Sequence, residues 1–198
     1  KFGQEIISTL AGRRVHPNFA VVGGVNKALS AEGRDYILSG VDEAIATLQL
    51  GLKIMKDWAA ANQEDINKFA VLQSGYLGLV KPGNALELYN GQIRLIDRSG
   101  AELELFEDSS YLDYIAEHVE PWTYLKFPYY KKLGWPEGVY RVGPLGRLNV
   151  SDRISTPLAN EALKEFKALN PGHPVEQTLY FHYARLIEAL YAVEQVRV

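Results

Sequence analysis

The sequence predicts an α+β fold that is mainly helical, with one long spine helix and a small antiparallel β-meander. Two observations carry this prediction. Between residues 30 and 62, apolar side chains recur at alternating steps of four and three, which is the period of one helix face. Between residues 71 and 106 the period falls to two and turn residues interrupt the chain, which is typical of short strands.

The chain begins with an amphipathic helical segment, and Gly12 has the position of its C-cap. The segment that follows contains Arg13, Arg14, His16 and Pro17, and then the glycine pair Gly23 and Gly24. A residue before proline favours extended backbone, and glycines permit positive φ. The pattern predicts a rigid loop that presents His16 beside two guanidinium groups. The alternative interpretation is a helix-ending loop with one solvated histidine.

The spine helix is expected to begin with Ser30 as its N-cap and Glu32 in its first turn, and to end near Asn62. About thirty residues at ~1.5 Å each would span ~45 Å. Glycine is a poor helix former, so Gly40 and Gly51 indicate close approach by another element. The apolar stripe contains Ile37, Val41, Ile45, Leu48, Leu52, Met55 and Ala59.

The meander is expected to start with a strand from Val71 to Val80. Residues 86–89 and 92–96 then flank Asn90-Gly91, a strong signal for a two-residue hairpin turn, and 101–106 form the last strand. One face would hold Leu86, Leu88, Ile93, Leu95, Leu103 and Leu105, and the other would expose Glu87, Arg94, Glu102 and Glu104 to water.

Residues 108–119 are expected to be helical, and an aromatic-rich, coil-like segment from Trp122 to Tyr140 follows. This segment is either a protein interface, where tryptophan and tyrosine are enriched, or a loop pinned to its own core. Two helices close the chain. The first has Thr156 as N-cap and Pro157 at its first position. Its expected buried side chains are Leu158, Ala162, Phe166 and Leu169, and those of the second are Leu179, Tyr183, Leu186, Leu190 and Val193.

Composition narrows the function classes. A net charge of −3 and a pI of about 5.9 argue against a general nucleic-acid binder. No apolar run approaches the ~18 residues that span a bilayer and no signal peptide is visible, so cytoplasm is the expected location. His118, His173 and His182 are scattered, and we expect neither a metal site nor a catalytic triad within these residues. Arg185 is expected to pair with Glu188 or Glu194 on the last helix.

Four motifs occur together in one order along the chain. They are Gly12-Arg13-Arg14-Val15-His16-Pro17 with Gly23-Gly24-Val25-Asn26-Lys27, Gly143-Pro144-Leu145-Gly146-Arg147-Leu148-Asn149, Thr156-Pro157-Leu158-Ala159, and Tyr183-Ala184-Arg185-Leu186-Ile187-Glu188. This set resembles the middle of the large subunit of nickel–iron hydrogenases, of the cytoplasmic type linked to NAD or a deazaflavin, from about residue 11 onward. Gly146 departs from the family's usual alanine, which would loosen that turn.

The resemblance implies reversible oxidation of dihydrogen by the parent protein. The family holds its nickel–iron centre with two Cys-x-x-Cys pairs, and this chain contains no cysteine. We therefore expect residues 1–198 to be a single central piece of a larger subunit, with helical residues 1–68, a β-meander insertion at 69–106, and mixed loop and helix at 107–198. The piece alone is expected to bind no metal or cofactor and to be inactive.

The resemblance also implies partners and site residues. The partners would be a small hydrogenase subunit with iron–sulfur clusters and diaphorase or deazaflavin-reducing subunits, with no nucleic acid and no membrane span. Residues facing a cluster or supporting the metal site would be Arg13, Arg14, His16, Gly23, Gly24, Arg147 and Asn149. An N–H of His16 could donate to a cluster sulfur and raise its potential. Arg147 and Asn149 could instead clamp a carboxylate or a neighbouring backbone.

Two further hypotheses stay open at this stage. One of the proteins in respiratory complex I shares the ancestry of this family, lacks the nickel–iron ligands and helps to form a quinone pocket. A purely structural domain is what composition alone would indicate. The dipeptide His16-Pro17 favours the hydrogenase, because the complex I relatives have another residue after the histidine.

Overall fold

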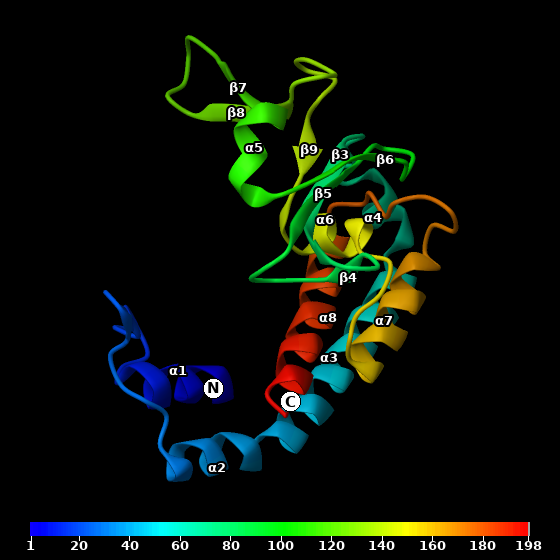
Figure 1. Cartoon of the computed structure of the whole chain (residues 1–198). Helices are drawn as coiled ribbons and strands as arrows, with labels where there is room; N and C mark the ends of the chain where they lie inside the picture. The colour runs from blue at the N-terminus through cyan, green and yellow to red at the C-terminus, as the bar shows by residue number, and fades with distance from the viewer. Residues whose placement is uncertain (198) are drawn as a thin grey trace.

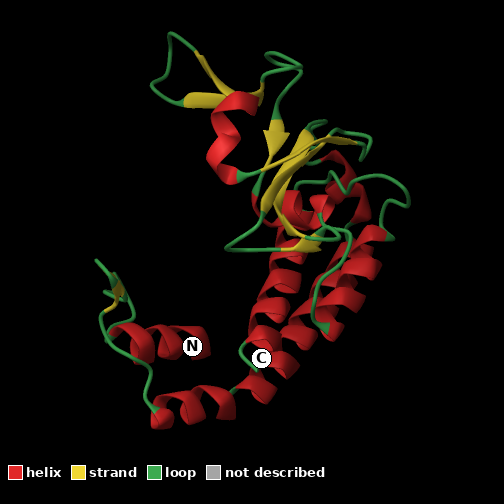
Figure 2. Cartoon of the chain, viewed as in Figure 1, coloured by secondary structure: helices red, strands yellow, loops and turns green. Residues whose placement is uncertain are grey.

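The structure is a computed structural model that describes residues 1–197. An N-terminal arm, defined as residues 1–30, projects from a body that contains a helical bundle and a small sheet (Figures 1 and 2). The helices are α1 Phe2–Ala11, α2 Ala31–Ser39, α3 Val41–Ala61, α4 Gln63–Lys68, α5 Tyr111–Tyr114, α6 Gly143–Val150, α7 Pro157–Lys167 and α8 Tyr180–Gln195, with a 3-10 turn at Asp108–Ser110. The strands are β1 Ala20–Val21, β2 Gly24–Val25, β3 Gly75–Lys81, β4 Ala85–Leu86, β5 Gln92–Ile96, β6 Glu102–Phe106, β7 Ile115–Val119, β8 Lys126–Tyr130 and β9 Tyr140–Arg141.

The core lies where α3, α7 and α8 pack side by side and α6 joins them beneath the sheet (Figure 1). The predicted apolar stripe of α3 supplies much of it, since Val41, Ile45, Leu52 and Ala59 are buried. Elements other than α3 also place large, fully buried side chains in this core, including Tyr76, Leu145, Phe166, Tyr180 and Ile187. The expected α+β fold, mainly helical with a small antiparallel sheet, is therefore confirmed. Within residues 1–197, no helix is both long and apolar enough to cross a lipid bilayer.

The main sheet has the strand order β4-β3-β5-β6, and β9 adds a short parallel pair to β3. Helix α6 packs against one face of this sheet. Gly78 of β3 makes the close approach possible, because a Cβ there would lie 2.9 Å from the Val150 side chain and 3.0 Å from the Arg147 Cα. Any larger residue at position 78 would push the helix away from the sheet.

The predicted 30–62 helix begins as expected, with the Ser30 hydroxyl accepting the Gly33 N–H at 3.1 Å. The prediction of one continuous helix was wrong, because α2 ends at Gly40 and a separate helix, α3, begins directly after it. The ring of Phe2 lies over Gly40, where a Cβ would come within 2.4 Å of it. The close approach inferred from Gly40 is thus confirmed. The spine is the 21-residue α3.

The predicted hairpin at Asn90-Gly91 is also wrong. Strands β4 and β5 do not pair with each other, because both pair with β3, in the registers Val80↔Leu86 and Val80↔Gln92. Gly91 is needed for a different reason, since a Cβ there would lie 2.6 Å from the Val80 carbonyl oxygen. The first strand also begins later than predicted, at Gly75.

The predicted helix at 108–119 is limited to a 3-10 turn and the four-residue α5, after which the chain becomes β7. Strand β7 pairs with β8, which lies inside the segment expected to be coil. The β-branched and aromatic residues of both strands stabilise this ribbon better than a helix. The His118 and Trp135 rings stack at 4.5 Å, while Trp122 and Tyr124 are exposed.

Several burial predictions need correction. Glu87 was expected in water but is buried, and the Arg94 side chain is almost covered. Leu88 and Leu105, expected on the apolar face, are exposed, because that face of the sheet is only partly covered. Leu158, in the first turn of α7, and Leu169, just beyond its end, are exposed as well.

Candidate functional site

The loop after α1 carries three of the predicted site residues. Gly12 ends α1 in the left-handed conformation with φ of 76° and donates its N–H to the Ser8 carbonyl at 2.8 Å. Arg13, Arg14 and His16 follow, and all three are exposed. The expected extended backbone at His16 was wrong, because its φ is +48°, a conformation that costs a non-glycine residue energy.

The predicted glycine pair lies in the same part of the arm. Strands β1 and β2 pair Ala20 with Val25 and Val21 with Gly24, and the chain turns between them. Gly23 and Gly24 have φ of 89° and 153°, so the inference of positive φ is confirmed.

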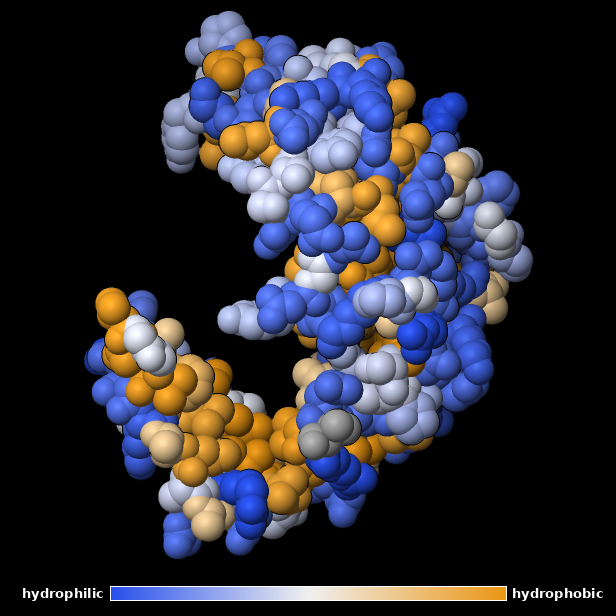
Figure 3. All heavy atoms as spheres, viewed as in Figure 1, coloured by the Kyte–Doolittle hydropathy of each residue, from blue (hydrophilic) through white to orange (hydrophobic). Residues whose placement is uncertain are grey.

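The arm presents both charge and apolar surface. It carries four Lys or Arg side chains and one carboxylate, Glu5. None of the residues of α1 is buried, and the hairpin exposes Val21, Val22 and Val25. Figure 3 shows this hydrophobic surface gathered on the arm and α2, at the lower end of the molecule. Exposed apolar surface of this kind marks an interaction site.

Few contacts hold the arm to the rest of the chain. The Phe2 ring packs on Gly40, and the Tyr36 hydroxyl donates to Glu5 Oε2 at 2.7 Å. Among the described residues, the His16 side chain makes no hydrogen bond. The imidazole expected to be exposed is therefore exposed and available to a partner.

The other two predicted site residues lie in the body, on α6. The guanidinium of Arg147 donates two parallel hydrogen bonds to the carboxylate of Glu188 on α8, from Nε to Oε1 at 2.6 Å and from Nη2 to Oε2 at 2.7 Å. Glu188 is buried, so this charge-assisted pair fixes α6 against α8. The expected clamp on a carboxylate is present, and the clamped group is internal. The predicted pairing of Arg185 with Glu188 was wrong.

Asn149 clamps a neighbouring backbone. Its Nδ2 donates to the Val175 carbonyl at 2.9 Å and its Oδ1 accepts the Val175 N–H at 3.0 Å. The Asn149 side chain thereby pairs with both backbone groups of Val175, as a neighbouring strand would, and fixes the loop before α8 to α6. Gly146 does not loosen this element, because a Cβ there would lie 2.7 Å from the Arg141 carbonyl oxygen. Arg147 and Asn149 thus share no site with the His16 loop.

The roles of two polar groups, one buried and one largely covered, were missed by sequence reasoning. Glu194 of α8 caps the N-terminus of α7: it accepts the Thr156 hydroxyl at 2.6 Å and the N–H groups of Leu158 and Ala159 at 3.0 and 2.9 Å. Thr156 therefore has the N-cap position but donates its hydroxyl instead of capping. The predicted Arg185–Glu194 pair is wrong, because Glu194 faces these groups of α7. No sequence signal links residues almost forty positions apart.

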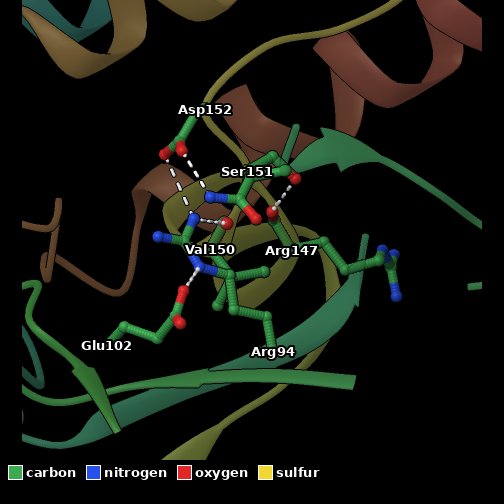
Figure 4. A network of polar contacts seen from close by, with 7 residues as sticks. Arg94, Glu102, Arg147, Val150, Ser151 and Asp152 are labelled. Carbon is green, nitrogen blue, oxygen red and sulfur yellow. Dashed lines mark hydrogen bonds and ion pairs between the residues drawn. The ribbon is translucent and has the colours of Figure 1, made fainter. Parts of the chain in front are cut away.

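The second missed group is Arg94, whose network is drawn in Figure 4. Its guanidinium donates to Glu102 Oε2 at 2.8 Å, to Asp152 Oδ1 at 3.1 Å and to the Val150 carbonyl. The network ties β5 and β6 to the end of α6. Alternation along β5 predicted a solvated arginine, because the pattern does not reveal which sheet face a distant helix covers.

Glu87 gives a testable pH dependence. Burial raises the pKa of Glu87, but the Lys81 ammonium and the N–H groups of Tyr89 and Leu88 outweigh it and hold the pKa below the usual 4.5. A depressed folded-state pKa adds stability above the unfolded pKa, and this is lost as the pH falls through the folded value. We expect urea unfolding from pH 7 downward to show the loss below about pH 4.5. Glu87→Gln should flatten that part of the profile, and an identical slope in both proteins would contradict the assignment.

The residues present do not fit a metal centre. The chain contains no cysteine, and within residues 1–197 no three His, Asp or Glu side chains gather as a ligand set. Nickel, iron and iron–sulfur clusters are held largely by thiolates in proteins. The candidate site is an exposed basic loop on an arm with exposed apolar side chains, which is suited to contact with another protein.

Comparison with known proteins gives a consistent result, although no protein-family model matches the sequence. A vhu subunit of the F420-non-reducing hydrogenase of Methanocaldococcus jannaschii is 42% identical over 198 residues, which cover 100% of this chain and 47% of that protein. The beta subunit of the NAD-reducing hydrogenase HoxS of Cupriavidus necator is 39% identical over 203 residues, covering 100% of this chain and 42% of that protein.

A comparison with solved structures gives the same result as the sequence comparison. It is described as an NAD+-reducing [NiFe]-hydrogenase in the H2-reduced state, and it matches with a TM-score of 0.92 and 35% identity over 100% of this chain and 44% of that chain. The chain thus spans about half the length of the relatives it matches. Over its whole length, in sequence and in fold, the chain is related to subunits of hydrogenases.

Proposed function

We propose that this chain forms part of the catalytic large subunit of a nickel–iron hydrogenase, whose activity is the reversible oxidation of dihydrogen. One observation carries the proposal: the fold matches a chain of a [NiFe]-hydrogenase with a TM-score of 0.92 at 35% identity, with every residue covered. An identity of that size over a whole chain supports a shared role as well as a shared fold.

The assignment to the large subunit rests on the sequence motifs. The arm motif Gly12 to Pro17 and the α6 motif Gly143 to Asn149 resemble that subunit, and both keep their order here. One relative, from Archaeoglobus profundus, is named an iron-sulfur subunit of an F420-non-reducing hydrogenase and is 32% identical over 203 residues. Because residues 1–198 contain no cysteine, they offer no thiolate to such a cluster. The proposal therefore assigns the clusters to a partner subunit.

The nickel–iron centre of such a subunit would supply the chemistry of dihydrogen, and the residues of this chain do not fit its ligand set. The proposed role of these residues is to hold the fold of the subunit together and to contact the partner subunit. The Arg147–Glu188 pair and the Asn149–Val175 ladder fix α6 against α8 and the loop before it. The exposed arm provides the surface for the partner.

His16 is the proposed contact with the partner's iron–sulfur cluster. Its imidazole is exposed, Arg13 and Arg14 precede it closely in the chain, and Pro17 stiffens the backbone next to it. An N–H donated toward cluster sulfur stabilises the reduced, more negative state and raises the potential, and the charges of Arg13 and Arg14 act in the same direction.

The proposal predicts that metal lies outside these residues. We expect purified 1–198 to contain no stoichiometric nickel, iron or zinc and to catalyse no exchange between dihydrogen and deuterated water. Elemental analysis by plasma mass spectrometry and a gas-exchange assay measure both. One nickel per chain would contradict the assignment of the ligands to polypeptide outside this chain.

A further inference from the structure

A small polar pocket lies between β5, the residue pair after α6 and the end of α7. Its volume is about 190 Å³, which is less than drug-sized ligands occupy. Charged side chains from three elements line it: Arg94 from β5, Asp152 just after α6, and Lys167, the last residue of α7. Residues of the loop after α7 complete the lining. The size of the pocket limits its ligand to a small ion or molecule.

The ammonium group of Lys167 is a charge without a partner in this pocket. Its side chain is half-buried, and within residues 1–197 it forms no hydrogen bond and no ion pair. Burial lowers the pKa of Lys167 from the usual 10.5, Asp152 opposes this effect, and the Arg94 guanidinium adds to it. A partly desolvated cation without a partner costs free energy, and an anion in the pocket would offset that cost.

Asp152 does not pair with Lys167, because both of its carboxylate oxygens are engaged elsewhere. Oδ2 accepts a hydrogen bond from Asn84 Nδ2 at 2.7 Å, and Oδ1 accepts one from Arg94 Nη1 at 3.1 Å. Burial raises the pKa of Asp152, but the bonds from Asn84 and Arg94 outweigh it and hold the pKa below the usual 3.8. The ionised Asp152 therefore holds Arg94 in place and leaves Lys167 without a counter-ion.

Arg94 offers a second donor to the pocket. Its Nε donates to Glu102 and its Nη1 to Val150 and Asp152, whereas Nη2 has no partner among the described residues and carries no dashed line in Figure 4. The side chain is only 11% exposed, and its three bonds fix its position. A fixed guanidinium with free N–H groups recognises the oxygens of phosphates and carboxylates, and a nearby ammonium adds a point charge.

We propose that this pocket binds a small oxyanion between the Lys167 ammonium and the Arg94 Nη2 group. The two charged groups without a partner are both donors, so they suit the oxygens of inorganic phosphate or of a carboxylate and not a cation. A bound oxyanion would join the end of α7 to β5 and so stabilise the body. The inference goes beyond the proposed function and does not depend on dihydrogen chemistry.

The test is phosphate binding by the complete protein that contains this chain, purified with its partner subunits in phosphate-free buffer. Equilibrium dialysis against radiolabelled phosphate measures the ions bound per chain. We expect one saturable site, which Lys167→Met weakens about tenfold or more because it removes a charge-assisted hydrogen bond. Lys164→Met is the matched control. Lys164 lies three residues earlier on α7, but it is 65% exposed, pairs with Glu161 and does not line the pocket.

Competition distinguishes the two sources of the oxyanion. If acetate displaces phosphate at a similar concentration, the pocket takes the carboxylate of an acidic group. If sulfate displaces phosphate and acetate does not, the pocket takes ions of the phosphate class. Either result supports an oxyanion site, because both ions present oxygens to the same two donors.

Folding is checked on the same proteins by thermal unfolding. Lys167→Met removes a half-buried charge without a partner, so its midpoint in phosphate-free buffer should not fall below that of the parent protein. Phosphate should raise the midpoints of the parent protein and of Lys164→Met more than that of Lys167→Met.

Two outcomes overturn the inference. One is the absence of saturable phosphate binding, and the other is binding that Lys167→Met and Lys164→Met weaken equally. Neither outcome bears on nickel content or isotope exchange of dihydrogen in the same protein, so failure here is distinguishable from failure of the proposed function.

Discussion

Replacing His16 with alanine in the assembled hydrogenase is expected to slow dihydrogen-dependent reduction of the physiological acceptor by about tenfold or more. The imidazole is exposed on a loop that a glycine C-cap and Pro17 hold in place, and the described residues give it no internal hydrogen bond. Nickel content and isotope exchange of dihydrogen should stay nearly unchanged, because both depend on the metal centre and not on electron exit. Steady-state rates, elemental analysis and exchange assays separate these effects.

His173→Ala is the control for this variant, because His173 is also exposed but belongs to the loop after α7. It should leave all three measurements unchanged. His16→Gln, which keeps an N–H donor, should recover part of the rate. Loss of nickel in His16→Ala, or an unchanged rate with the physiological acceptor, would show that the histidine has a structural role.

Replacing Glu194 with alanine is expected to lower the free energy of unfolding by about 3 kcal/mol, more than any other substitution proposed for this chain. The substitution leaves the Thr156 hydroxyl and the N–H groups of Leu158 and Ala159 without their acceptor at the start of α7. The carboxylate is buried, so water replaces it poorly. Urea denaturation of 1–198 measures the change in the free energy of unfolding.

Glu161→Ala provides the comparison for Glu194→Ala. Glu161 lies on α7 as well, but its side chain is 67% exposed and its ion pair is with Lys164 at the surface. Exposed pairs contribute little, so we expect a change below about 0.5 kcal/mol. If Glu194→Ala cost no more than Glu161→Ala, the capping role of Glu194 would be wrong.

Local signals predicted the helices well. The Ser30 cap, the Gly12 C-cap and the Pro157 start were all read correctly, because each acts through groups within a few residues. The apolar stripe of α3 also followed its helical period into the core. One exception was Gly40, where the predicted helix is interrupted and the ring of Phe2 lies close by, and another was the helix predicted at residues 108–119.

Strand pairing was predicted less well, because tertiary contacts decide it. Asn90-Gly91 has the chemistry of a hairpin turn, yet β3 offers both neighbouring strands a better partner and becomes the centre of the sheet. Residues 115–119 were compatible with a helix, and their pairing with β8 selected the strand. Such choices depend on elements that the local pattern does not contain.

The candidate site divides in the same way. The arm residues Arg13, Arg14, His16, Gly23 and Gly24 are all exposed, and their role as one site stays a prediction. Arg147 and Asn149 were predicted either to support the metal site or to clamp a carboxylate or a neighbouring backbone, and the structure shows the clamp, on Glu188 and on Val175. A motif shows that a residue type is needed and does not show which distant group it contacts.

Under the proposed function, this chain forms part of the catalytic large subunit of a nickel–iron hydrogenase. The most direct measurement is made on the complete protein that contains this chain, purified with its partner subunits, by quantifying nickel and exchange between dihydrogen and deuterated water in the same sample. We expect about one nickel per copy, bound by thiolates, and isotope exchange that follows the nickel content. A complex without nickel that catalyses no exchange would contradict the claim.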